Sequence, residues 1–239
     1  MRMDGSVNDP IRWRGREVSR MEAITDGMFG FAITLLVVSL EVPSSFDETL
    51  RRMSGVLAFA LCFAMMIWVW SSHNQFCRRF GLSDARTMLL NFALVFVVLF
   101  FVYPLKFVAL GLVAHLSSLA GRLVVPNGLK IQAQELPILF AIYGFGVAAV
   151  FGLFGLMYLH VRRRADDLEL DPIERRAVAV EAIRFFALAL LGVVSATVAI
   201  TTKNISMAGY LYTFIGVIEW QQGTRLGNLV RQRRSEAVS

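Results

Sequence analysis

Few side chains in this 239-residue chain have the types and spacing that catalysis or metal binding requires. The three histidines, His73, His115 and His160, stand far apart, and none has another possible ligand at metal-binding spacing. Cys62 lies in an apolar run and Cys77 beside two arginines, so the pair predicts neither a disulfide framework nor a metal site. Phosphate-binding glycine loops and paired carboxylates are absent as well. We therefore expect no enzyme, no metal and no cofactor.

A second group of polar residues borders long apolar runs, where hydrogen bonds between helices are the chemistry to expect. Asp26 comes just before a charge-free run from Gly27 to Leu40, and Arg20 stands six residues earlier. Six residues correspond to about 240° around a helix, so these two side chains cannot pair on one face. Asp26 therefore needs a partner from another helix.

The elements that position these residues are predicted to be membrane helices. The chain is 56% apolar, contains 19 Phe and has a mean hydropathy of +0.59. Long charge-free windows alternate with short polar clusters, and about 20 apolar residues are needed to cross a bilayer. The windows predict an all-α, polytopic protein, a single transmembrane domain over 1–239, with six transmembrane helices at about 22–42, 53–75, 87–107, 136–160, 180–202 and 204–220. The last span is short, and only Lys203 separates it from the fifth.

The distribution of basic residues predicts the orientation of these spans. With six spans, 18 of the 24 basic residues fall on the side of the two termini. The other side receives only Arg51, Arg52, Lys106, Arg122, Lys130 and Lys203. The positive-inside rule then places both termini in the cytoplasm of a multi-pass cell-membrane protein. The net charge of +6 is thus a property of loops, and no nucleic-acid partner is expected.

The interiors of all six predicted spans lack Asp, Glu, Lys and Arg. Intramembrane ionisable residues are typical of proton relays and ion-coupled transport, so their absence argues against a pump or a proton-driven carrier. A passive conduit or a structural subunit remains. Ahead of the fifth span, Asp171, Pro172 and Glu174 predict a capped helix start with a capping-box pattern.

Three motifs in order resemble the transmembrane protein 175 family of potassium channels. That family's first helix carries Arg, three residues, then Phe-Ser-Asp; this chain has Arg20, three residues, then Ile24, Thr25 and Asp26. The second predicted span ends in WVWSSHNQF, similar to the family's Trp and His, here Trp70 and His73. The third carries LLNFALVFVVLFFVYPL, similar to the family's Asn and Pro, here Asn91 and Pro104.

The resemblance implies a homotetrameric channel for potassium ions, with the first helix lining the pore and bulky apolar rings setting selectivity. It makes Phe31, Leu35 and Val38 candidate constrictions, Thr34 a candidate pore hydroxyl and Glu41 a candidate pore-mouth residue. It also implies an interhelical network of Arg20, Thr25, Asp26, Trp70, His73 and Asn91. Phe31 departs from the family pattern, which has a smaller aliphatic side chain at that position.

Two other functions are compatible with a polytopic, charge-poor chain. A secondary solute carrier predicts inverted repeats and interrupted helices near the midplane. A non-conducting membrane scaffold predicts no ion flux and no pore-lining helix. Without the resemblance, the polar residues at span ends would be read as solvated helix ends and the apolar stripe as ordinary packing.

Overall fold

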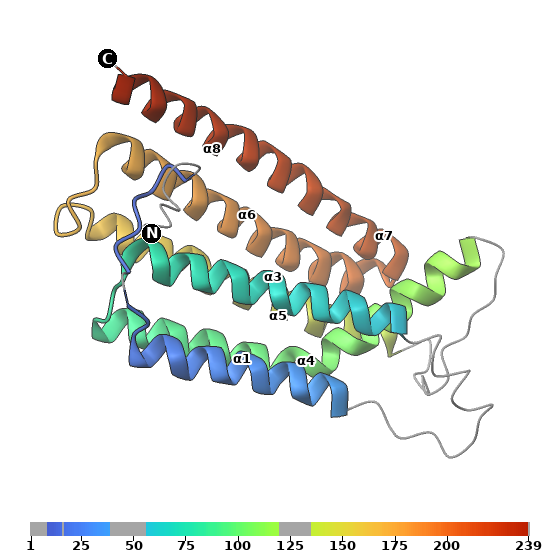
Figure 1. Ribbon diagram of the computed structural model, residues 1–239. Coiled ribbons are helices and arrows are strands. Elements are labelled where there is room, and N and C mark those ends of the chain that lie inside the picture. Colours follow the sequence, from blue (N-terminus) through green and yellow to red (C-terminus); the bar gives the residue numbers. More distant parts are fainter. Residues whose placement is uncertain (1–8, 16, 39–55, 120–134, 239) are drawn as a thin grey trace.

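The computed structural model describes residues 9–15, 17–38, 56–119 and 135–238, and within these ranges the chain is helical, without a strand. The long helices are α1 (Arg20–Val38), α3 (Val56–Phe80), α4 (Ala85–Leu119), α5 (Leu136–Arg163), α6 (Pro172–Thr202) and α8 (Phe214–Val238). Two short pieces, α7 (Ile205–Tyr210) and the 3-10 turn η2 (Leu211–Thr213), connect α6 to α8. Figure 1 shows the long helices running side by side as a bundle. The all-α prediction is confirmed for the described part.

Four helices are long and apolar enough to cross a membrane: α3, α4 over Ala85–Val102, α5 and α6. They correspond to the expected spans at 53–75, 87–107, 136–160 and 180–202. The expected first span reaches beyond Val38, where the described part of α1 ends. The expected span at 204–220 differs from the structure, because this segment is divided among α7, η2 and α8, and α8 continues to Val238.

The bundle consists of two groups of helices. α1 packs on α3 and α4, while α6 packs on α5, α7 and α8, and the contact of α5 with α4 joins the groups. α5 and α6 approach most closely at two glycines, where a Cβ on Gly144 would lie 2.7 Å from the carbonyl oxygen of Gly192. Small residues of this kind allow membrane helices to pack backbone to backbone.

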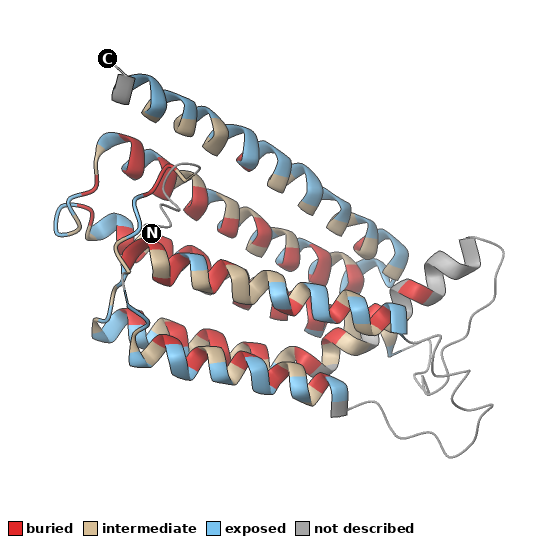
Figure 2. Ribbon diagram, in the orientation of Figure 1, coloured by how far each residue is buried: buried red, intermediate tan, exposed pale blue. Residues whose placement is uncertain are grey.

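Apolar side chains line both the core and the outer surface. An aromatic stack of Phe154, Phe185 and Tyr158 fills the space between α5 and α6, with ring centroids 4.9 and 5.4 Å apart. In Figure 2 the buried residues face the interior of the bundle and the exposed ones face outward. Leu89, Phe96 and Leu190 are more than half exposed. Exposed apolar surface of this extent fits a lipid environment.

The predicted start of α6 is confirmed in detail. The Asp171 carboxylate accepts the backbone N–H of Glu174 at 2.8 Å, and the Glu174 carboxylate accepts that of Asp171 at 3.1 Å. This reciprocal capping box satisfies two backbone donors that the helix itself leaves free.

Candidate functional site

α1 carries most of the predicted site residues, and it buries one of its faces. The helix starts at Ser19, whose hydroxyl accepts the backbone N–H of Glu22 at 3.1 Å. The buried residues then recur every three or four positions, which defines a single face turned toward α3 and α4. They are Glu22, Thr25, Phe29, Ala32 and Leu36. The other residues of α1 are exposed or only partly buried by the described part of the chain.

Asp26 finds the interhelical partner that its position requires. Its carboxylate accepts the indole N–H of Trp70 at 2.9 Å, which joins α1 to α3. Both side chains are half-buried. A hydrogen bond to an ionised carboxylate is among the stronger kinds, so this contact fixes the register between the two helices.

His73 and Asn91 form a fully buried pair between α3 and α4. The Nε2 atom of His73 lies 2.5 Å from the Asn91 amide oxygen, and the Asn91 amide nitrogen donates to the backbone oxygen of Thr87 at 2.7 Å. Because the Asn91 oxygen is the acceptor, Nε2 carries the proton and Nδ1 is the free lone pair. Nδ1 is buried without a hydrogen-bond partner in the described part of the chain. The Phe29 ring of α1 lies over this histidine, with centroids 5.7 Å apart.

Thr25 and Arg20 are placed differently from these two pairs. The Thr25 hydroxyl is buried and donates to the backbone oxygens of Met21 and Glu22 at 2.8 and 2.9 Å, within its own helix. The Arg20 side chain is exposed, and it has no hydrogen bond or ion pair to any described residue. The structure instead places Arg78 of α3 beside α1, with its Nε 3.7 Å from the buried carboxylate of Glu22.

Phe31, Thr34 and Leu35, the predicted pore residues whose side chains the structure describes, lie outside the buried face of α1. Phe31 is 58% exposed, Gly27 and Thr34 are exposed, and Leu35 is half-buried. The Thr34 hydroxyl donates to the backbone oxygen of Gly30 at 2.9 Å. The side chain of Val38 and the whole of Glu41 lie outside the described residues. Figure 2 shows the exposed residues as a pale stripe along α1.

A buried charge cluster joins the ends of α3 and α5 to α6 and α8, and the sequence did not predict it. Arg79, 6% exposed, donates to Glu181 at 2.7 Å, to the Tyr158 hydroxyl at 3.0 Å and to Asp9 at 2.9 Å. Glu181 also accepts from Arg184 at 2.9 Å and from Gln222 at 2.5 Å. The i,i+3 spacing of Glu181 and Arg184 is typical of a surface pair on one helix face and gives no sign of Arg79, which lies 102 residues before Glu181.

Asp84 organises the connection between α3 and α4. Its carboxylate accepts the hydroxyl of Thr87 at 2.7 Å and lies 2.9 Å from Nε2 of His160 and 3.4 Å from the guanidinium of Arg164. Burial raises the pKa of Asp84, but the Thr87 hydrogen bond and the contact with His160 outweigh burial, so its pKa lies below the usual value. Asp84 thereby ties the end of α5 to the start of α4.

None of these clusters resembles a metal centre. Among the residues that the structure describes, no three His, Cys, Asp or Glu side chains gather closely enough to hold a metal ion. Cys62 and Cys77 are both buried and free. The arrangement can hold helices in register and present one face of α1, but it offers no group for covalent chemistry.

Comparison of the sequence with known proteins gives a consistent set of relatives. The family described as "Endosomal/lysosomal potassium channel TMEM175" matches residues 20–102, the range that contains Asp26, Trp70, His73 and Asn91. A protein from Marivirga tractuosa named "Potassium channel" is 36% identical over 174 residues, 70% of this chain and 69% of the relative. A potassium channel of Chamaesiphon minutus is 32% identical over 101 residues, 39% of this chain and 50% of that relative.

Two solved structures share the fold over most of the chain. The crystal structure of a variant of the potassium channel MtTMEM175, in complex with a nanobody–MBP fusion protein, superposes with a TM-score of 0.77 at 28% identity. The match covers 96% of this chain and 97% of that one. A lysosomal potassium-selective channel TMEM175 homolog from Chamaesiphon minutus gives a TM-score of 0.59 at 19% identity, over 85% and 96% of the two chains, and is evidence for the fold alone.

Proposed function

This chain belongs to the TMEM175 family of potassium channels, and on that premise we propose that it is the subunit of a potassium-selective, leak-type cation channel whose pore is lined by α1. Membership in a channel family agrees with the expectation that the chain is not an enzyme. The permeant species is the potassium ion, and the proposal involves no cofactor. Neither the solute carrier nor the scaffold is favoured by a specific contact in the described residues.

The uncovered face of α1 is the observation that carries this proposal. One face of α1 is buried against α3 and α4 within the chain, while Gly27, Phe31 and Thr34 lie outside it. If four subunits surround an axis, this free face can meet its copies around a central passage. A homotetramer would thus cover a helix face that a single chain leaves exposed.

The selectivity of such a passage would come from bulky apolar rings. Phe31, Leu35 and Val38 recur at helical spacing, so four copies would stack three rings along the axis. An ion in an apolar ring sheds water without gaining carbonyl ligands, which favours potassium because it loses its hydration more easily than sodium. The Thr34 hydroxyl is bonded to its own helix in this structure, so it would have to rotate to contact an ion. Glu41 remains a proposed pore-mouth residue outside the described range.

The membrane topology of this proposal has six spans and both termini in the cytoplasm of the cell. The sixth span would comprise Asn204 to Trp220, which rises about 25 Å through α7, η2 and the start of α8. Met207, Tyr210, Phe214, Val217 and Trp220 are exposed along this segment. Trp220 precedes the polar part of α8, a position typical of tryptophan at a membrane interface.

Reconstitution of the purified protein in liposomes tests this function. We expect an imposed potassium gradient to drive ion flux that is larger for potassium than for sodium and absent from protein-free liposomes. A protein that assembles and inserts but passes neither ion would instead be a scaffold. Flux of potassium that requires a second, coupled solute gradient would indicate a carrier.

A further inference from the structure

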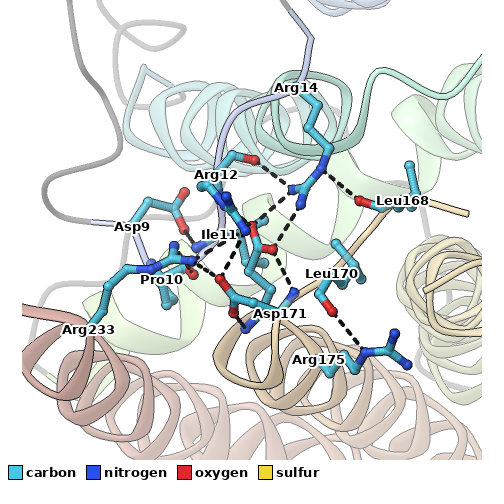
Figure 3. Close-up of polar contacts among 11 residues, drawn as sticks. Asp9, Pro10, Ile11, Arg12, Arg14, Leu168, Leu170, Asp171, Arg175 and Arg233 are labelled. Carbon is cyan, nitrogen blue, oxygen red and sulfur yellow. Dashed lines mark hydrogen bonds and ion pairs between the residues drawn. The ribbon is translucent and has the colours of Figure 1, made fainter. Parts of the chain in front are cut away.

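Residues 9–15 form an irregular segment, the N-terminal strap, that crosses the inner ends of several helices. The strap has no regular secondary structure, yet Ile11 is completely buried. Figure 3 shows Arg12 of the strap and Arg233 of α8 meeting at Asp171 at the start of α6, with Arg14 of the strap nearby. An extended segment held in this way has lost much of its conformational freedom, so its contacts must supply the compensating free energy.

The strongest contact of the strap is with Glu174 in the first turn of α6. The Arg14 guanidinium donates to both carboxylate oxygens, at 3.0 and 2.8 Å, and the backbone N–H of Arg12 donates to one of them at 2.8 Å. Glu174 is completely buried and precedes the charge-free part of α6, which begins at Phe185. Burial raises its pKa, but the hydrogen bonds from Arg14 and from the backbone of Arg12 and Asp171 outweigh this and bring it to about 2.

The strap also lies backbone to backbone against the end of α3. The N–H groups of Arg14 and Gly15 donate to the backbone oxygens of Arg79 and Arg78 at 3.3 and 3.0 Å. A Cβ at Gly15 would lie 2.6 Å from the backbone oxygen of Cys77, so only glycine permits this approach. At the other end, Arg233 of α8 donates to the backbone oxygen of Pro10 at 2.6 Å.

The strap therefore adds a second connection between α3 and α6, beside the buried Arg79–Glu181 pair, and it also contacts α8. α1 packs on α3 and α4, whereas α6 and α8 belong to the other group of helices. From Gly15 the chain reaches the start of α1 at Arg20 within five residues, at most about 18 Å of extended chain. A connection this short limits how far the start of α1 can move away from the strap.

We propose that Arg14 is a positioning residue for the pore helix. By donating hydrogen bonds to both carboxylate oxygens of Glu174, it holds the strap in place and so fixes the inner end of α1 relative to α6 and α8. This inference rests on the proposed function of α1. The ion flux through an apolar constriction depends steeply on the width of the constriction. If α1 occupies many positions, the widest pores therefore carry most of the flux. Release of the strap would broaden the range of α1 positions, raise total flux and reduce the preference for potassium.

Arg14→Gln tests the proposal, with Arg12→Gln as the matched control. Both changes remove one positive charge from the strap. The Arg12 side chain is 59% exposed, so its pairs with Asp171 at 3.2 Å and with Glu174 at 3.5 Å are screened by water, whereas Arg14 donates to both oxygens of the buried Glu174 carboxylate. In liposomes we expect Arg14→Gln to raise sodium flux and lower the potassium-to-sodium flux ratio by roughly threefold or more, with Arg12→Gln close to wild type. Arg14→Lys, which keeps the charge, should restore part of the ratio. Equal ratios in wild type, Arg14→Gln and Arg12→Gln would overturn the proposal.

Hydrogen exchange provides a readout that does not depend on conduction. In the wild type, the amides of Arg12 and Gly15 should be protected, because both are hydrogen-bonded. In Arg14→Gln, exchange should accelerate both in the strap and in the first turns of α1, while α5 remains unchanged. Either of two results would refute the coupling between the strap and α1: unprotected strap amides in the wild type, or faster exchange in Arg14→Gln that is confined to the strap. The wild-type measurement can be made even if Arg14→Gln fails to assemble. Absence of any wild-type potassium flux would count against the channel function instead.

Discussion

The hydrogen bond between Asp26 and Trp70 sets the position of α1 on α3. Asp26 is only half-buried, so its carboxylate stays partly accessible to water while it accepts the indole N–H at 2.9 Å. One turn further along α3, the His73–Asn91 pair joins α3 to α4. Together these pairs attach three successive helices to one another at similar depth, at the end of α1 opposite the proposed pore mouth.

A double-mutant cycle on Asp26→Ala and Trp70→Phe measures the first of these contacts. We expect a coupling free energy of about 0.5–2 kcal/mol in unfolding of the detergent-solubilised protein, because the two side chains share one hydrogen bond. The cycle of Trp70→Phe with His160→Gln is the control, since these residues have no shared partner and should be additive within about 0.5 kcal/mol. Additivity in the first cycle would make Asp26 a solvated helix-end residue.

Some of these interhelical contacts could be predicted from the sequence. Asp26 stands out because it borders an apolar run and cannot pair with Arg20 on its own helix, whereas Trp70, His73 and Asn91 are expected from the resemblance to the family's motifs. The ion pair of Arg14 with Glu174 could not be predicted, because the two residues are 160 positions apart and each resembles an ordinary charged residue of a loop. Arg20 belongs to the same motif as Asp26 but points to the exposed side of α1. A motif gives residue types, whereas partners depend on the packing of distant helices.

At the scale of elements, the glycines of α5 and α6 set how closely these helices pack. A Cβ on Gly144 would meet the Gly192 backbone oxygen at 2.7 Å, and a Cβ on Gly192 would meet the Gly144 backbone oxygen at 2.6 Å. Two turns along α5, Gly152 is different, since its Cβ would make an ordinary contact of 3.9 Å with the Ala189 methyl group.

Gly144→Ala should therefore destabilise the bundle, whereas Gly152→Ala should not. Overpacking against a backbone oxygen is expected to cost about 1–3 kcal/mol at Gly144. At Gly152 the substitution should be neutral or slightly stabilising, because the helix propensity of alanine is better than that of glycine by about 0.5–1 kcal/mol. Thermal unfolding of the two purified variants distinguishes these outcomes. Equal melting temperatures for both variants would show that the close approach of α5 and α6 is not needed for stability.

Four spans could be predicted at the element scale because charge-free windows are a direct signature of membrane helices. The span expected at 204–220 is not among these four, and the continuation of the helix to Val238 could not be predicted, because α8 is polar on most of its surface. Its apolar residues Ile215, Ile218, Leu226 and Leu229 recur at helical spacing and lie against the core. Arg233 then pairs with Asp171, so a stretch that reads as a basic tail is held as a helix along α6. Tertiary contacts, rather than hydropathy, give this segment its structure.

At the scale of the whole molecule, the proposed six-span topology would place the strap, Glu174 and the end of α8 together in the cytoplasm. Reporter fusions after residues 125 and 239 should then report opposite sides of the membrane. The reason is the excess of arginine on the side of the termini, which retains those loops in the cytoplasm. A fusion after residue 84 should agree with the one after residue 239. Reporters after 125 and 239 on the same side would rule out this topology.

The proposed channel function requires that the exposed face of α1 lines the conduction path. Potassium and sodium fluxes through liposome-reconstituted Leu35→Asn and Phe31→Asn channels test this claim, with Leu190→Asn, an exposed apolar residue of α6, as control. A polar ring can hydrate either ion, so both α1 variants should raise total flux and lower the potassium-to-sodium ratio by roughly threefold or more, while Leu190→Asn should leave the ratio unchanged. Unchanged flux and ratio in α1 variants that still assemble would contradict the account.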